Sequence, residues 1–197
     1  VTLFPLIDID KTAMLAYRDL PATIEILRSP HRPTLEQLLA EQHSMFDVVI
    51  ASRPAVMETV NPIWTQIPEP NRPCLIYDAE ALCCLREFAF KELLGLKMSA
   101  SKFTSDLIEE LDLAKEADLV LSVSKNDSSM FRGYGYETVE VTDCPERECT
   151  KSPFDERNGF LFVGPLPDYL TPNTDSICWL LSKVWPFVLA SIDEVKS

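Results

Sequence analysis

The stretch CLIYDAEALCCLREF, residues 74–88, joins a short apolar run to a segment with helical periodicity and places two carboxylates, Asp78 and Glu80, at the junction. The run CLIYD has the length and residue types of a buried strand. The segment from Glu80 to Leu94 repeats apolar residues at helical spacing. A buried strand followed directly by a helix is the repeating unit of parallel α/β sheets.

The same alternation of strand and helix continues along the chain. Runs such as FDVVIAS and DLVLSVS are apolar almost throughout, which is typical of strands buried on both faces of a parallel sheet. The sequence therefore predicts a doubly wound, mostly parallel Rossmann-like α/β sheet with helices on both faces. The predicted strands cover residues 1–7, 23–28, 46–52, 74–78, 118–124, 137–142 and 159–164. The predicted helices cover residues 11–20, 34–44, 54–66, 80–94 and 104–117, with a short one after Ser124 and a last one after Pro172.

A polar region late in the chain indicates a domain boundary. Residues 144–159, CPERECTKSPFDERNG, carry two prolines and many charges, a composition that is typical of linkers. We therefore expect a Rossmann-like domain over residues 1–150 and a linker over residues 151–158. Residues 159–197 would then supply the opening strand and helix of a second domain.

The composition excludes several classes of partner. The chain has 197 residues and a formal net charge of −13, so a nucleic-acid backbone would repel it across most of its surface. Its longest apolar runs fall far short of the roughly 20 residues that a membrane helix needs. The chain does not begin like a signal peptide. We expect no nucleic-acid partner and no transmembrane segment.

The cysteines predict a reducing compartment. Four of the six lie in apolar runs, where a free thiol behaves as a small core residue: Cys74, Cys83, Cys84 and Cys178. The other two, Cys144 and Cys149, flank the loop PERE without a CxxC motif or a histidine at ligand spacing, which argues against a zinc site. A cytoplasmic location fits this pattern.

The topology turns scattered polar residues into a short set of site candidates. In an open parallel sheet, ligands bind outside the carboxyl ends of the strands. The chain has no GxGxxG or GxxxxGK[ST] loop, so an ordinary dinucleotide or P-loop site is not expected. The polar residues that follow predicted strands are Ser52 and Arg53, Asp78 and Glu80, Ser122 to Lys125, and Gly164.

Each acidic candidate has a structural and a functional interpretation. Asp78 could accept hydrogen bonds from substrate hydroxyls, or it could end the strand and cap the following helix. Glu80 falls in the predicted first turn of that helix, where the helix dipole alone accounts for a carboxylate.

The basic and hydroxyl candidates also have more than one interpretation. Arg53 follows a core strand and precedes Pro54, so it could bind a ligand at a rigid loop. Arg86 lies beside an apolar helical stripe of Leu82, Leu85, Ala89 and Leu93, and could present its guanidinium to a cleft or pair with a neighbouring side chain. Ser124 could cap a helix whose amides form an anion site.

Four segments, taken in order, resemble a known family. FDVVIASRP, LIYDAEALCCLREF, LDLAKEADLVLSVSKND and RNGFLFVGPLPDYLTPNTDSICWLLSKVWPFV are similar to segments of the retaining glycosyltransferases of family 4, the glycosyl transferases group 1. The resemblance covers nearly the whole chain. It lies in an RP after the third strand, a YD with LRE around the fourth, and an FVG with PN, D and W in the second domain.

This resemblance implies the two-Rossmann-domain GT-B architecture. In that family the N-terminal domain binds the acceptor, the C-terminal domain binds the nucleotide-sugar, and transfer proceeds with retention and without a required metal or other cofactor. By the same comparison the chain begins at the second strand of the first domain and ends after the first helix of the second. We expect such a fragment to be inactive alone and to require the missing donor-domain part. The resemblance assigns no catalytic residue. Within this interpretation, the candidates for substrate contacts are Arg53, Asp78, Glu80, Arg86 and Ser124, and Gly164 is the candidate for a donor-phosphate loop.

Two departures leave an alternative open. Pro165 follows Gly164 where relatives often have a second glycine, which removes an amide donor from the phosphate loop. Asp127 stands where many relatives carry glutamate. The alternative is a non-catalytic Rossmann-like module that serves for protein interaction or scaffolding.

Overall fold

The computed structural model describes residues 1–6, 20–27, 32–141, 153–156, 159–166 and 171–196. The chain divides into two compact units, Val1–Pro145 and Glu146–Ser197, which are considered separately. The predicted helix over residues 11–20, apart from residue 20, and half of the predicted linker over residues 151–158 lie outside the described residues.

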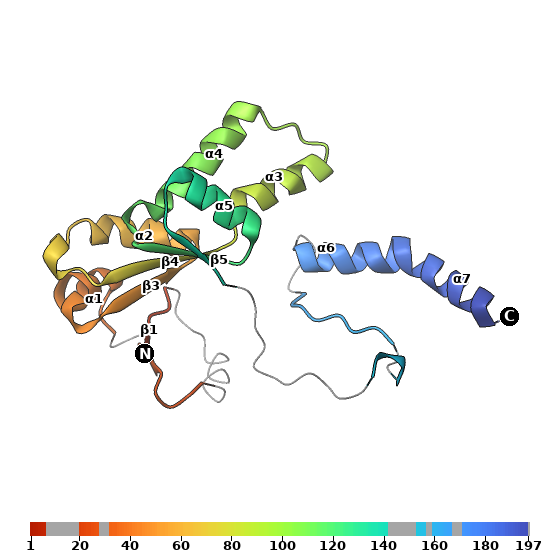
Figure 1. The fold of residues 1–197 in the computed structure, drawn as a ribbon, viewed down its shortest axis with the longest axis horizontal. Helices are drawn as coiled ribbons and strands as arrows, with labels where there is room; N and C mark the ends of the chain where they lie inside the picture. The colour runs from red at the N-terminus through yellow and green to blue at the C-terminus, as the bar shows by residue number, and fades with distance from the viewer. Residues whose placement is uncertain (7–19, 28–31, 142–152, 157–158, 167–170, 197) are drawn as a thin grey trace. The chain divides into compact units, whose positions relative to one another are not determined.

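The first unit is built on a four-stranded parallel sheet (Figure 1). Its strands follow one another in the order β3-β4-β5-β6, and every neighbouring pair is parallel. Two further strands form a separate parallel pair. The prediction of a parallel α/β sheet flanked by helices is confirmed. The strands are β1 (Thr2–Leu3), β2 (Glu25–Ile26), β3 (Val48–Ser52), β4 (Cys74–Glu80), β5 (Leu119–Ser122) and β6 (Thr138–Glu140).

The helices of this unit begin and end at residues with clear local reasons. Thr34 forms a capping box with Gln37, Pro54 occupies the first turn of its helix, and Ser99 caps the helix that follows it. Gly135 ends the last helix with φ of 106°, a left-handed conformation that favours glycine. The helices are α1 (Leu35–Gln42), α2 (Pro54–Trp64), α3 (Cys83–Leu93), α4 (Ala100–Asp112) and α5 (Lys125–Tyr134). Short 3₁₀ turns cover His43–Met45, Glu69–Asn71 and Leu113–Glu116.

The hydrophobic core lies on one face of the sheet. Leu75 and Tyr77 of β4 are fully buried, as is Trp64 of α2. Figure 1 shows α2, α4 and α5 on one side of the sheet, and their apolar side chains belong to this core. On the opposite face, by contrast, Ile50 is 60% exposed and Val139 is 45% exposed. Among the described residues, the two faces of the sheet are therefore covered unequally.

Strand β4 extends two residues further than the sequence predicts. It continues through Glu80, because Glu80 pairs with Ser122 of β5 beyond an irregularity in register between Asp78 and Glu80. Helix α3 begins only at Cys83. The prediction that Glu80 lies in the first turn of the helix is therefore wrong: Glu80 is the last residue of the strand.

The second unit is mainly helical where the structure describes it. Helix α6 (Pro172–Trp179) passes through a π-helical turn (Leu180–Val184) into α7 (Trp185–Lys196), and a 3₁₀ turn covers Phe154–Glu156. The predicted strand over residues 159–164 is not present. An extended segment becomes a strand only when its backbone pairs with a neighbour, and no described strand pairs with this one. Phe160 instead stacks edge-on against Trp185, with ring centroids 5.0 Å apart.

The described cysteines are less buried than the sequence predicts. Cys74, Cys83 and Cys178 are free but exposed, so the prediction that they are core residues is wrong, while Cys84 is half-buried. Hydrophobic periodicity does not distinguish the end of a strand, or the exposed side of a helix, from the core beside it.

Across the described residues, no helix is both long and apolar enough to span a membrane.

Candidate functional site

The carboxyl ends of β3 and β4 bring Ser52 and Asp78 together. The two residues are directly opposite in the parallel register. The Ser52 hydroxyl donates a hydrogen bond to Asp78 Oδ2 over 2.9 Å. The other carboxylate oxygen of Asp78 makes no hydrogen bond with a described residue, so it can accept one from a ligand hydroxyl.

Arg53 and Glu80 form an ion pair one step further along the same edge. Arg53 Nε donates to Glu80 Oε2 over 2.8 Å, although the two side chains are 70% and 46% exposed. The terminal guanidinium nitrogens of Arg53 make no hydrogen bond or ion pair with a described residue. They remain able to donate two parallel hydrogen bonds to a planar anion or to hydroxyl oxygens.

Both members of this ion pair have a strained backbone. Arg53 has φ of 79° and ψ of 154°, and Glu80 has φ of 58°. Among the described residues they are the two that adopt positive φ without being glycine. Conformations of this kind cost about 1–3 kcal/mol each and cluster at functional sites. Their pairing identifies this edge as the candidate site.

Neighbouring backbone bonds explain how the strain is held. The Arg53 amide donates to the carbonyl of Asp78 over 2.8 Å, and the Val123 amide donates to the carbonyl of Glu80 over 3.1 Å. Pro54 also disfavours a helical conformation at Arg53. The strained residues are thus tied to β4 and to the segment after β5, so the two side chains are positioned by the sheet.

The end of β5 supplies a network of serine hydroxyls. Ser124 Oγ accepts a hydrogen bond from the Asp127 amide over 3.1 Å, which confirms its interpretation as a helix cap. The buried Ser122 hydroxyl donates to the Ser124 carbonyl over 3.1 Å, and Ser128 Oγ lies 3.2 Å from Ser122 Oγ. Asp127 is buried in the first turn of α5, where the helix dipole favours its charge. These bonds fix the start of α5 at the site's border.

The N-terminus of α3 is capped by a residue from another helix. Glu110 of α4 is buried, and its two carboxylate oxygens accept hydrogen bonds from the amides of Cys83 and Cys84 over 2.6 and 2.7 Å. The interpretation of Asp78 as the cap of this helix is therefore wrong. Burial, with a smaller contribution from Glu110, raises the pKa of the Cys84 thiol to about 12.

Arg86 lies near the start of α3 but has no bond to the edge residues. It is exposed, and its terminal nitrogen Nη2 lies 3.5 Å from Cys83 Sγ. The apolar stripe expected beside it is buried only at its beginning: Leu82 is buried and Leu93 is 82% exposed. The described contacts thus connect Arg86 to its own helix, while Arg53, Asp78 and Glu80 connect to one another.

Gly164 belongs to the second unit. A Cβ atom at Gly164 would lie 3.0 Å from Nδ2 of Asn173, in the first turn of α6. Asn173 Nδ2 also donates to the Pro165 carbonyl over 3.3 Å. This close approach gives the glycine a packing role next to a helix start.

The residues that complete the site carry no distinctive sequence signal. Glu110 lies 27 residues from the amide of Cys83 that it caps. Ser122 follows a predicted strand only as one of a run of four residues, and Ser128 follows no predicted strand. In the part of the chain that the structure describes, no group of three or more His, Cys, Asp or Glu side chains could hold a metal ion.

No protein-family profile, curated protein or solved structure matches this chain.

Proposed function

We propose that this chain is the acceptor-side domain of a retaining glycosyltransferase that uses a nucleotide-sugar donor, together with the opening of the donor-side domain. The observation that carries the proposal is the ion pair between the strained residues Arg53 and Glu80, beside Ser52 and Asp78. The order of the segments that resemble family 4 glycosyltransferases supports the choice of reaction.

The geometry suits the recognition of a hydroxylated acceptor. The carboxylates of Asp78 and Glu80 can accept hydrogen bonds from sugar hydroxyls, and each already has one oxygen oriented by Ser52 or Arg53. Ligand binding at these groups needs little reorganisation, because the sheet positions them beforehand. Arg53 can donate to a ligand oxygen through its terminal nitrogens while Nε stays on Glu80.

Transfer with retention would occur on the front face of the donor sugar. Negative charge then develops on the leaving diphosphate and has to be stabilised by donor-side groups. Within this chain, the role of the edge residues is to bind the acceptor and orient its hydroxyl. No step of the proposed role requires a metal.

The test uses the protein encoded by the full reading frame that contains this chain. Release of nucleoside diphosphate is measured with UDP-glucose, GDP-mannose and related donors, with and without glycoside acceptors. We expect acceptor-dependent release, and a loss of about 10- to 100-fold in kcat/KM for Arg53→Ala, since a positioned donor group is removed. Arg86→Ala, which removes an equal charge without a bond to the edge, should have a much smaller effect.

Two results would contradict this proposal. Equal losses for the two arginine variants would mean that charge near the sheet edge matters and that the Arg53 geometry does not. Absence of release from every donor, by a correctly folded full-length protein, would favour the non-catalytic interaction module instead.

A further inference from the structure

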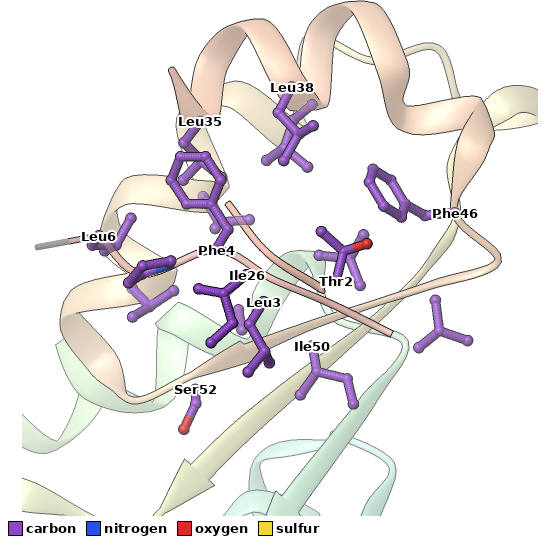
Figure 2. Close-up of a pocket in the computed structure, with 17 residues that line it drawn as sticks. Thr2, Leu3, Phe4, Leu6, Ile26, Leu35, Leu38, Phe46, Ile50 and Ser52 are labelled. Atoms are coloured by element: carbon purple, nitrogen blue, oxygen red, sulfur yellow. The ribbon is translucent and has the colours of Figure 1, made fainter. Parts of the chain in front are cut away.

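A second feature of the first unit is an apolar pocket of about 410 Å³ (Figure 2). It is lined by the β1–β2 pair, helix α1, strand β3 and two valines of α2. The pocket forms because the β1–β2 pair is not hydrogen-bonded to β3. Within the described residues, β3 pairs with β4 alone, so the space beside its other edge is filled by no strand.

The lining is suited to an apolar ligand. Figure 2 shows Phe4, Leu35, Leu38 and Ile50 around the space, and Thr2 and Ser52 are the lining residues with polar side chains. The volume lies within the range of about 300–1,000 Å³ that is usual for small-molecule sites. A sugar placed here would lose water and gain almost no hydrogen bonds, whereas an alkyl or aryl group would gain burial.

The pocket borders the candidate site at Ser52. Ser52 lines the pocket, and the same hydroxyl donates to Asp78 over 2.9 Å. Arg53, the next residue, is paired with Glu80. A molecule with an apolar group in the pocket would therefore carry its polar group towards the carboxylates at the sheet edge.

One wall of the pocket is held in place by a cation. Arg32 lies over the ring of Phe4, with Cζ 4.7 Å from the ring centroid, and its guanidinium donates a hydrogen bond to the carbonyl of Pro5. These contacts tie the segment after β1 to the residues before α1. The wall formed by this segment is thus held at two points.

We propose that this pocket binds the apolar part of the acceptor, which makes the acceptor an amphiphile: an alkyl or aryl group that carries a hydroxylated head. The inference rests on the proposed function and adds the class of acceptor. The head would lie at Asp78 and Glu80, and the apolar part would lie beside β3. A peptide strand that pairs with the free edge of β3 is the competing occupant.

The test compares alkyl β-D-glucosides of increasing chain length. Ethyl, hexyl and octyl glucoside are titrated into the protein by calorimetry, each below its micelle concentration. Every methylene that enters the pocket should tighten binding about fourfold, so octyl glucoside should bind about 15-fold more tightly than hexyl glucoside. The stoichiometry should be one to one.

A matched pair of variants separates the pocket from other apolar surface. Ile50→Asp places a charge at an exposed lining residue of β3 and should weaken the binding of octyl glucoside by at least about tenfold. Val139→Asp makes a similar change at an exposed residue of β6 that does not line the pocket, and should leave the affinity unchanged. Circular dichroism verifies the fold of both variants.

The outcomes distinguish this inference from the proposed function. The pocket assignment is overturned if the affinity for the glucosides does not depend on chain length, or if Ile50→Asp and Val139→Asp weaken binding equally. Such results would fit a pocket that holds a peptide strand, or non-specific binding of the detergent. The chain-length series in the unmodified protein decides the matter even if Ile50→Asp fails to fold. Nucleoside diphosphate release alongside failed pocket binding would leave the glycosyltransferase proposal standing. Pocket binding without such release would leave an amphiphile-binding protein.

Discussion

The buried carboxylate of Glu110 offers a sharp test of how α3 is held. It accepts hydrogen bonds from the amides of Cys83 and Cys84 over 2.6 and 2.7 Å, so it satisfies two of the amides that the first turn of any helix leaves without a partner. Helix α3 has no side-chain cap of its own at Leu82. Removing the carboxylate should therefore destabilise the contact between α3 and α4.

The size of the loss follows from the two bonds. A hydrogen bond to a charged group contributes about 1.5–3 kcal/mol, so two bonds set an upper range of roughly 3–6 kcal/mol. Two effects reduce this loss: water can replace the carboxylate at the amide of Cys83, and the variant no longer bears the cost of burying the carboxylate. We therefore expect Glu110→Ala to lower the free energy of unfolding by about 3 kcal/mol. Glu110→Gln retains one acceptor oxygen and should cost about 2 kcal/mol.

The assay is urea unfolding of the 197-residue chain, followed by far-ultraviolet circular dichroism. With a denaturant dependence of about 2 kcal/mol per molar urea, Glu110→Ala should lower the midpoint by about 1.5 M. Glu109→Ala is the matched control: this exposed neighbour on α4 accepts one bond from Ser105 and should change stability by less than about 0.5 kcal/mol. Equal midpoints for the two variants would refute the capping role of Glu110.

Three further predictions concern buried and strained groups. Tyr77→Phe should leave stability unchanged or raise it by about 1 kcal/mol at pH 7, because the buried Tyr77 hydroxyl has no hydrogen-bond partner among the described residues. Burial raises the pKa of Tyr77, so above about pH 10 this tyrosine ionises in the unfolded chain before it ionises in the folded protein. Its ionisation lowers the free energy of unfolding of the unmodified protein. Urea titrations should therefore show a smaller loss of stability above that pH for Tyr77→Phe. At pH 8, iodoacetamide should modify exposed Cys83 and spare Cys84, whose pKa is raised to about 12, as mass spectrometry would show; equal labelling would contradict this. Gly135→Ala should cost about 1 kcal/mol in thermal unfolding, because the strain comes from φ of 106° while no described atom lies within 4 Å of the added Cβ; an unchanged melting temperature would argue against that conformation.

Local sequence signals predicted most elements of the first unit. Strands β3 to β6 and helices α1 to α5 fall where hydrophobic periodicity and cap residues placed them, within a few residues at each end. Ser124 caps α5 as its sequence context indicates, and Pro54 begins α2. These features depend on residues that are neighbours in the chain, which is why a pattern in a single sequence can reveal them.

The errors arise where a distant segment decides the outcome. Glu80 belongs to β4 because Ser122 pairs with it, and Asp78 does not cap α3 because Glu110 does. Residues 159–164 have the composition of a strand but no described strand pairs with them. In the first two cases the competing partner lies far away in the sequence, and in the third the strand lacks a described partner to pair with. Periodicity carries no information about either.

The amino-acid sequence was thus sufficient to predict a parallel α/β sheet and the polar residues that follow its strands, since both depend on local composition and on the general rule that parallel strands end at one edge. Tertiary structure alone decided that Arg53 and Glu80 meet with strained backbones, and that an apolar pocket opens beside Ser52. Strain and cavities result from the way in which separate segments constrain one another. They have no counterpart in the periodicity of any one segment, and they are what gives the edge of this sheet its proposed function.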